Sequence, residues 1–149
     1  MSLPSLLPLP DLLRSCAAQA EQALVAALAA QGVASSALPE GFLAAFGRVA
    51  AVSDFVAEQA LREPLRLLEQ VRSGELQQSL QPGDLRARLQ ASLLDCADEE
   101  ALGRCLRGFR NAQQLRIIWR DVTRQAALLA TRRDLSDMAD ACIDLAYHW

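Results

Sequence analysis

The clearest pattern of hydrophobic and polar positions lies near the C-terminal end of the chain. Apolar residues recur there at steps of three and four, which is the spacing of one helix face. They are Leu135, Met138, Ala139, Cys142, Ile143, Ala146 and Trp149. A second stripe near the other end consists of Leu13, Ala17, Ala20, Leu24, Ala27 and Leu28. Each stripe predicts an amphipathic helix.

Start and stop signals divide the intervening sequence into further helices. Asp11 is the expected N-cap of the first helix and Gly32 its stop. Ser53 is expected to cap a later helix, and Pro64 to end that helix or open the next. These signals predict helices over residues 11–31, 40–51, 54–63, 64–72 and 85–97, and a flexible connection over 73–84.

The longest predicted helix begins after Asp98, its expected cap, and continues to about Leu129. The segment 131–134, "TRRD", has the spacing of a capping box and predicts the start of the final helix. On the long helix the apolar stripe changes face near residue 112. We therefore expect different neighbours to pack along its length, with its central turns buried on several sides.

Composition favours an all-α fold. Hydrophobic residues make up 52% of the 149 residues, but aromatic residues only 5%, so leucine and alanine must form most of the core. Both are strong helix formers. We expect an irregular leader over residues 1–10 and one domain over 11–149, a bundle of about five to seven helices around one long central helix. The leader lacks the basic start of a signal peptide, and no apolar run is long enough to span a membrane.

The stretch "QQLRIIWRD" (113–121) sets charges among apolar residues. Arg116 and Arg120 are four residues apart on one helix face, and Asp121 lies about 100° away from Arg120. If the arginines are buried, each needs a carboxylate, and the candidates on other helices are Asp54, Asp137 and Asp140. One interpretation is an ion-pair network that fixes helix register. The others are an arginine pair that reaches a phosphate or an acidic partner, and accidental surface charge.

Several function classes lack support in the residues. The net charge of −3 argues against a nucleic-acid surface. The four cysteines have no CxxC spacing and His148 is the single histidine, which argues against a zinc site and for reduced, buried thiols. The chain has no phosphate-binding loop, GxSxG or HExxH motif. On its own residues, the chain does not look like a complete enzyme.

Three segments together resemble a known family. They are residues 50–76 with "SDFV", residues 106–122 with "LRGFRNAQQLRIIWRDV", and residues 135–149 with "LSDMADACIDLAYHW". Their order and spacing resemble the N-terminal helical region of the bifunctional glutamine synthetase adenylyltransferase/adenylyl-removing enzymes. The resemblance covers about residues 45–149. Its motif positions here are Ser53, Asp54, Phe55, Arg110, Arg116, Trp119, Arg120 and Asp121.

The resemblance implies a role in the control of bacterial nitrogen assimilation. Members of this family carry two nucleotidyltransferase domains. One half attaches AMP from ATP to a tyrosine of glutamine synthetase, and the N-terminal half removes it by phosphorolysis. Acidic residues hold the Mg²⁺ ion, and glutamine and the PII signal protein set the direction of the reaction.

The family's "GKxGGxELN…SDxD" stretch is expected soon after Trp149, where this sequence ends. We therefore expect a cytoplasmic, non-catalytic helical scaffold with no catalytic or metal residue and no cofactor of its own. Its expected partners are the following nucleotidyltransferase domain, glutamine synthetase and PII, and neither nucleic acid nor membrane. The alternatives are a stand-alone helical interaction module and a small metal-free helical enzyme.

Overall fold

The computed structural model describes residues 8–149. Over this range the chain forms seven α-helices and two short 3-10 turns, η1 and η2, and no strand, which confirms the expected all-α class. The helices and turns are α1 (Asp11–Ala30), η1 (Ser35–Ala37), α2 (Phe42–Ala50), α3 (Asp54–Arg62), α4 (Pro64–Arg72), η2 (Glu75–Gln77), α5 (Asp84–Leu93), α6 (Glu99–Val122) and α7 (Leu128–Tyr147).

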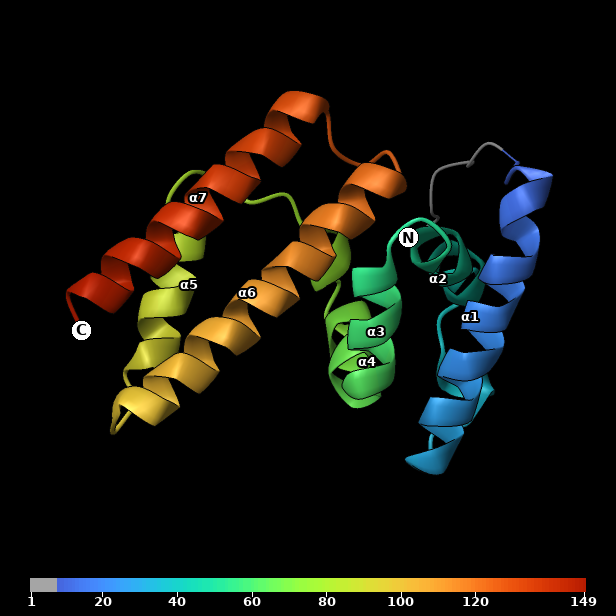
Figure 1. The fold of residues 1–149 in the computed structure, drawn as a ribbon, viewed down its shortest axis with the longest axis horizontal. Helices are drawn as coiled ribbons and strands as arrows, with labels where there is room; N and C mark the ends of the chain where they lie inside the picture. The colour runs from blue at the N-terminus through green and yellow to red at the C-terminus, as the bar shows by residue number, and fades with distance from the viewer. Residues whose placement is uncertain (1–7) are drawn as a thin grey trace.

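The long helix α6 separates two groups of helices (Figure 1). α1 to α4 lie on one side of it, and α5 and α7 lie on the other. α7 returns beside α6 in the opposite direction, as two helices joined by a short connection commonly do. The predicted long central helix is therefore present, with its neighbours divided between its two sides.

Each side of α6 has its own hydrophobic core. The core formed with α1 to α4 receives Leu115 and Trp119 from α6, and the core formed with α5 and α7 receives Phe109 and Ile117. The indole of Trp119 is fully buried and stacks on Phe42, with ring centroids 5.6 Å apart. The predicted change of face along the long helix is thus confirmed, and its central turns are buried on more than one side.

Local capping signals located several helix boundaries correctly. The Ser53 hydroxyl accepts a hydrogen bond from the Val56 amide (3.4 Å), and the Asp98 carboxylate accepts one from the Ala101 amide (2.7 Å). Pro64 is the first residue of α4. The cap predicted at Asp11 is wrong, because α1 begins at Asp11 itself and the residue before it, Pro10, makes no side-chain cap.

The connection between α6 and α7 is longer than the sequence indicated. α6 ends at Val122 instead of continuing to about Leu129, and α7 begins at Leu128 instead of within 131–134. Arg124 adopts a left-handed conformation (φ 57°), which ends a helix but which patterns seldom reveal outside glycine. The amides of residues 125 and 126 both donate to the carbonyl of Arg120 and satisfy it at the helix end.

The connection between α4 and α5, expected to be flexible, is anchored in both cores. It includes η2, which contributes the fully buried Leu76 to the core on the α1–α4 side. Leu80 is 2% exposed and belongs to the core on the α7 side. The expectation overlooked these two leucines among polar neighbours. The helix that follows also ends earlier than predicted, at Leu93 instead of near Ala97.

No helix within residues 8–149 is both long enough and apolar enough to cross a membrane. The predicted leader at 1–10 falls mostly outside the described residues. Its last three residues, 8–10, form neither helix nor strand.

The cap of α6 can be tested with Asp98→Ala. We expect this change to lower the free energy of unfolding by about 1 kcal/mol, because the Ala101 amide loses its acceptor. Asp95→Ala is the matched control, since Asp95 is exposed, precedes the cap and removes the same charge. Urea unfolding measures both. Equal losses in the two variants would contradict a specific cap.

Candidate functional site

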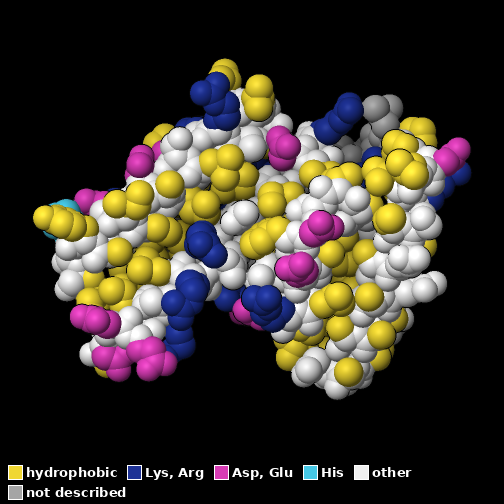
Figure 2. Space-filling model, viewed as in Figure 1, with side chains coloured by type: hydrophobic (Ala, Val, Ile, Leu, Met, Phe, Trp, Pro, Cys, Tyr) yellow, Lys and Arg dark blue, Asp and Glu magenta, His cyan; other side chains and the backbone are white. Residues whose placement is uncertain are grey.

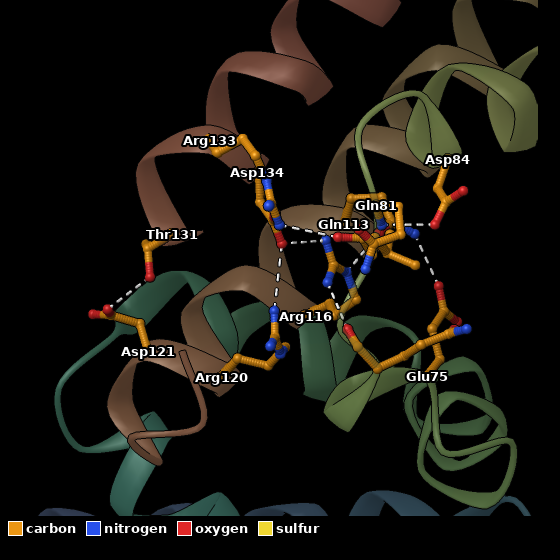
Figure 3. Close-up of polar contacts among 12 residues, drawn as sticks. Glu75, Gln81, Asp84, Gln113, Arg116, Arg120, Asp121, Thr131, Arg133 and Asp134 are labelled. Carbon is orange, nitrogen blue, oxygen red and sulfur yellow. Dashed lines mark hydrogen bonds and ion pairs between the residues drawn. The ribbon is translucent and has the colours of Figure 1, made fainter. Parts of the chain in front are cut away.

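Buried charges from α6 and α7 meet where these two helices pack against each other (Figure 3). Arg116 has no exposed surface, and Arg120 and Asp134 are 5% and 2% exposed. Arg116 Nη2 lies 2.9 Å and Arg120 Nη1 lies 3.5 Å from the same oxygen, Asp134 Oδ2. We refer to these three residues as the arginine–aspartate cluster.

Every nitrogen of the Arg116 guanidinium has an acceptor. Nε donates to Gln113 Oε1 (2.8 Å), Nη1 to the Gln78 carbonyl (2.8 Å) and Nη2 to Asp134. Gln113 is itself 3% exposed and donates through Nε2 to Glu75 Oε1 (2.8 Å). These bonds connect α6 with α7, with η2 and with the segment that follows η2.

Asp134 also receives a third guanidinium. Arg133 Nη2 donates to Asp134 Oδ1 (3.1 Å) and to the Leu80 carbonyl (3.0 Å). Arg120 is less completely bonded than Arg116: its Nη2 donates to the Gln125 carbonyl (3.3 Å), but its buried Nε has no partner among the described residues. One carboxylate therefore serves three arginines, of which Arg116 is held best.

The electrostatics of Arg116 reflect this balance. Burial lowers the pKa of the Arg116 guanidinium, whereas the hydrogen bond and the charge of Asp134 raise it, and the charge of Arg120 lowers it further. Arginine nevertheless stays protonated in proteins. The fold thus holds a positive charge away from water, and the arrangement is stable only while Asp134 supplies the opposite charge.

The residues predicted from the sequence are only partly brought together. Arg116 and Arg120 share the cluster, but Asp54 lies exposed at the start of α3 and Arg110 is exposed, with Nη2 donating to Asn111. Asp121 is exposed too, and accepts a hydrogen bond from the Thr131 hydroxyl (3.0 Å).

The predicted carboxylate partners Asp54, Asp137 and Asp140 are wrong, because the carboxylate beside both arginines is that of Asp134. Asp134 was missed because it was assigned to a helix start, whereas it lies inside α7. The sequence does contain a pattern that indicates Asp134. At steps of four and three, Asp134 lies on the same helix face as Met138 and Ala141, the two apolar residues of α7 that are buried. A charged residue in line with such a face indicates a buried ion pair.

The cluster faces inward and presents no reactive surface. It contains no nucleophile, and each nitrogen of the buried Arg116 guanidinium is already bonded to a protein acceptor. No group of three or more histidine, cysteine, aspartate or glutamate side chains within residues 8–149 could hold a metal ion. The arginine–aspartate cluster, as the structure presents it, connects α6 with α7 and with the segment around η2.

A groove of about 620 Å³ lies between α4, α5 and α6. Figure 2 shows arginine side chains beside a hollow at the lower edge of the molecule. The groove is lined by Arg66, Arg88 and Arg104, and each has a glutamate nearby: Glu63, Glu75 and Glu100. Because the charges are balanced, the groove does not form a specific anion site.

All four cysteines are free thiols, and none is fully buried: Cys16 is exposed, and Cys96, Cys105 and Cys142 are partly buried. The expectation of buried thiols is therefore wrong for Cys16 and only partly right for the others. Burial raises the pKa of Cys105, and neighbouring Cys96 raises it further. Burial also raises the pKa of Cys142.

Comparison with known proteins assigns the chain to a family. The family model described as glutamate-ammonia ligase adenylyltransferase matches residues 43–149. The chain belongs to this family. The matched range contains α3 to α7 entire and nearly all of α2, so it includes the whole arginine–aspartate cluster, whereas α1 lies outside it.

Curated relatives in the adenylyltransferase family match the chain over its whole length. It is 58% identical to a bifunctional glutamine synthetase adenylyltransferase/adenylyl-removing enzyme of Pseudomonas aeruginosa and 50% identical to one of Pseudomonas syringae, in each case over 100% of this chain and 16% of the relative. A relative from Thioalkalivibrio sulfidiphilus is 39% identical over 98% of the chain and 15% of its own length. The chain thus spans about one sixth of these relatives. No solved structure matches it.

The arginine–aspartate cluster can be tested with Asp134→Asn. This change keeps the shape of the side chain but leaves two buried guanidinium groups without a counter-charge, so we expect a loss of about 3–5 kcal/mol in the free energy of unfolding. Asp140→Asn, at an exposed position of the same helix, removes the same charge and serves as the control. Chemical denaturation followed by circular dichroism measures both. A loss under about 1 kcal/mol for Asp134→Asn would contradict the cluster.

The thiols can be tested by alkylation with iodoacetamide, followed by mass spectrometry across a pH series. A raised pKa leaves less thiolate at a given pH. We therefore expect Cys105 and Cys142 to react at higher pH in the native chain than in the urea-unfolded chain. Exposed Cys16 reports whether the reagent acts equally in both states. Overlapping native and unfolded profiles for Cys105 and Cys142 would contradict the burial effect.

Proposed function

We propose that this chain is a helical, non-catalytic scaffold within an enzyme that adenylylates and deadenylylates glutamine synthetase. The observation that carries the proposal is the 58% identity, over the whole chain, to the bifunctional glutamine synthetase adenylyltransferase/adenylyl-removing enzyme of Pseudomonas aeruginosa. Because the chain corresponds to only 16% of that relative, the activity belongs to the longer polypeptide.

The scaffold role is supported by the way the family-matched polar residues are used. Arg116, Gln113 and Asp134 bond to one another and to backbone groups inside the protein. A buried polar network of this kind fixes the relative positions of the helices that contribute to it. In this proposal α6 and α7 form a rigid support whose register is set by the cluster.

The family resemblance implies ATP and Mg²⁺, and the described residues offer no group suited to the metal. Magnesium prefers several oxygen ligands, chiefly carboxylates and waters, and the acidic residues of 8–149 form no group suited to a metal. We infer that both bind elsewhere in the longer polypeptide, in a nucleotidyltransferase domain. Glutamine synthetase and the PII signal protein are the proposed partners of that polypeptide, and the cytoplasm is its proposed location.

The proposal can be tested in the Pseudomonas aeruginosa relative, by deleting the segment that matches this chain and then replacing it with this chain. We expect the deletion to lower both AMP transfer to glutamine synthetase and phosphate-dependent AMP removal. The replacement should restore both, since the two segments are 58% identical over the whole chain. Radiolabelled AMP bound to glutamine synthetase is the measurement.

Two controls complete this test. The isolated chain, mixed with adenylylated glutamine synthetase, phosphate and Mg²⁺, should release no ADP. A replacement that carries Asp134→Asn should restore less activity than the unaltered chain, because Arg116 and Arg120 lose the carboxylate that pairs with them between α6 and α7. Turnover by the isolated chain would contradict a non-catalytic role. A folded but inactive replacement would instead favour a stand-alone interaction module.

A further inference from the structure

Helix α7 leaves an apolar face uncovered. Seven apolar residues of α7 lie within one third of the helix circumference and are exposed, and we call them the α7 apolar face: Leu128, Leu129, Leu135, Ala139, Ile143, Ala146 and Tyr147. The exposed fractions are 70% for Leu128, 42% for Leu135, 70% for Ile143 and 83% for Tyr147. Figure 2 shows hydrophobic side chains gathered over α7, at the upper left of the molecule.

The opposite side of α7 is already occupied. Asp134, Met138 and Ala141 are buried against α5 and α6, with Asp134 held by the arginines. The apolar residues of α7 therefore extend over a wider arc than α5 and α6 cover. Single exposed leucines are normal in soluble proteins, but a row of exposed apolar side chains along one helix, interrupted here by Arg132 and Ser136, indicates an interaction surface.

The length of the surface suits a packed secondary-structure element better than a small ligand. α7 has 20 residues, which corresponds to about 30 Å of helix. Arg132 lies exposed within the same arc and forms no ion pair with the described residues. An element that covers the α7 apolar face must therefore be apolar and must bring an acceptor, such as a carboxylate, to Arg132.

The length of the relatives suggests which polypeptide covers the α7 apolar face. The family match runs through all of α7, yet the chain is only 16% of the Pseudomonas enzymes. We propose that the α7 apolar face is where the remainder of the longer polypeptide docks, through an apolar helix or sheet face with a carboxylate opposite Arg132. This inference rests on the proposed function, since it assumes that the chain acts within such a polypeptide.

Side-chain labelling by hydroxyl radicals tests the docking without measuring activity. The isolated chain is compared with the Pseudomonas aeruginosa enzyme in which this chain replaces the matching segment. We expect labelling of Ile143 and Tyr147 to be lost in the long protein. Leu94, which is 82% exposed immediately after the end of α5, is expected to keep its labelling in both. Unchanged labelling of Ile143 and Tyr147 would overturn the proposal.

A variant pair separates docking from folding. Ile143→Glu should leave the melting temperature of the isolated chain unchanged, because the side chain is exposed, but should restore Tyr147 labelling in the long protein. Leu94→Glu, the matched control, should leave Tyr147 protected. Arg132→Glu should also restore the labelling, by placing like charges together. Continued protection of Tyr147 in Ile143→Glu would overturn the docking surface.

Sedimentation of the isolated chain distinguishes a second copy as the occupant. We expect a monomer. A dimer that Ile143→Glu dissociates, and that persists in the long protein, would overturn the proposal in favour of self-association. Protection of the α7 apolar face in a long protein that does not adenylylate glutamine synthetase would support docking while contradicting the proposed function, so the two failures are distinguishable.

Discussion

The buried contact between Arg116 and Asp134 is the constraint on which the arrangement of α6 and α7 depends. Arg116 has no exposed surface, so its charge requires a carboxylate within bonding distance. A slip of α7 by one turn would move that carboxylate by about 5.4 Å and leave the charge unpaired. Apolar side chains alone tolerate such shifts better, so the polar pair fixes the register of the two helices.

The same contact explains how α6 serves two hydrophobic cores. Trp119 and Leu115 point into the core with α1 to α4, and Phe109 and Ile117 into the core with α5 and α7. Arg116 lies between them in the sequence, and its bonds reach Gln113, the segment after η2 and α7. Gln113 in turn bonds to Glu75 of η2. The polar network therefore joins the two cores at the turns of α6 where the apolar stripe changes face.

The sequence predicted those features of the fold that depend on interactions between residues close together in the chain. The caps at Ser53 and Asp98 depend on hydrogen bonds within three residues, so they are visible in the sequence. The end of α6 was missed because it depends on a left-handed Arg124, which no local rule favours. The partner of Arg116 was missed because residues 116 and 134 meet only after α7 packs on α6.

The orientation of α7 follows from these constraints and has a consequence for its surface. A helix with a wide apolar arc ordinarily turns its most apolar line inward. Here the arginines draw Asp134 into the interior, so the buried line is Asp134, Met138 and Ala141, and Leu135 and Ile143 are turned outward. Because the ion pair sets that rotation, relieving the exposure by turning α7 would unpair Arg116. The proposed docking of further polypeptide on the outer face would satisfy both requirements, because Arg116 stays paired while the apolar side chains are removed from water.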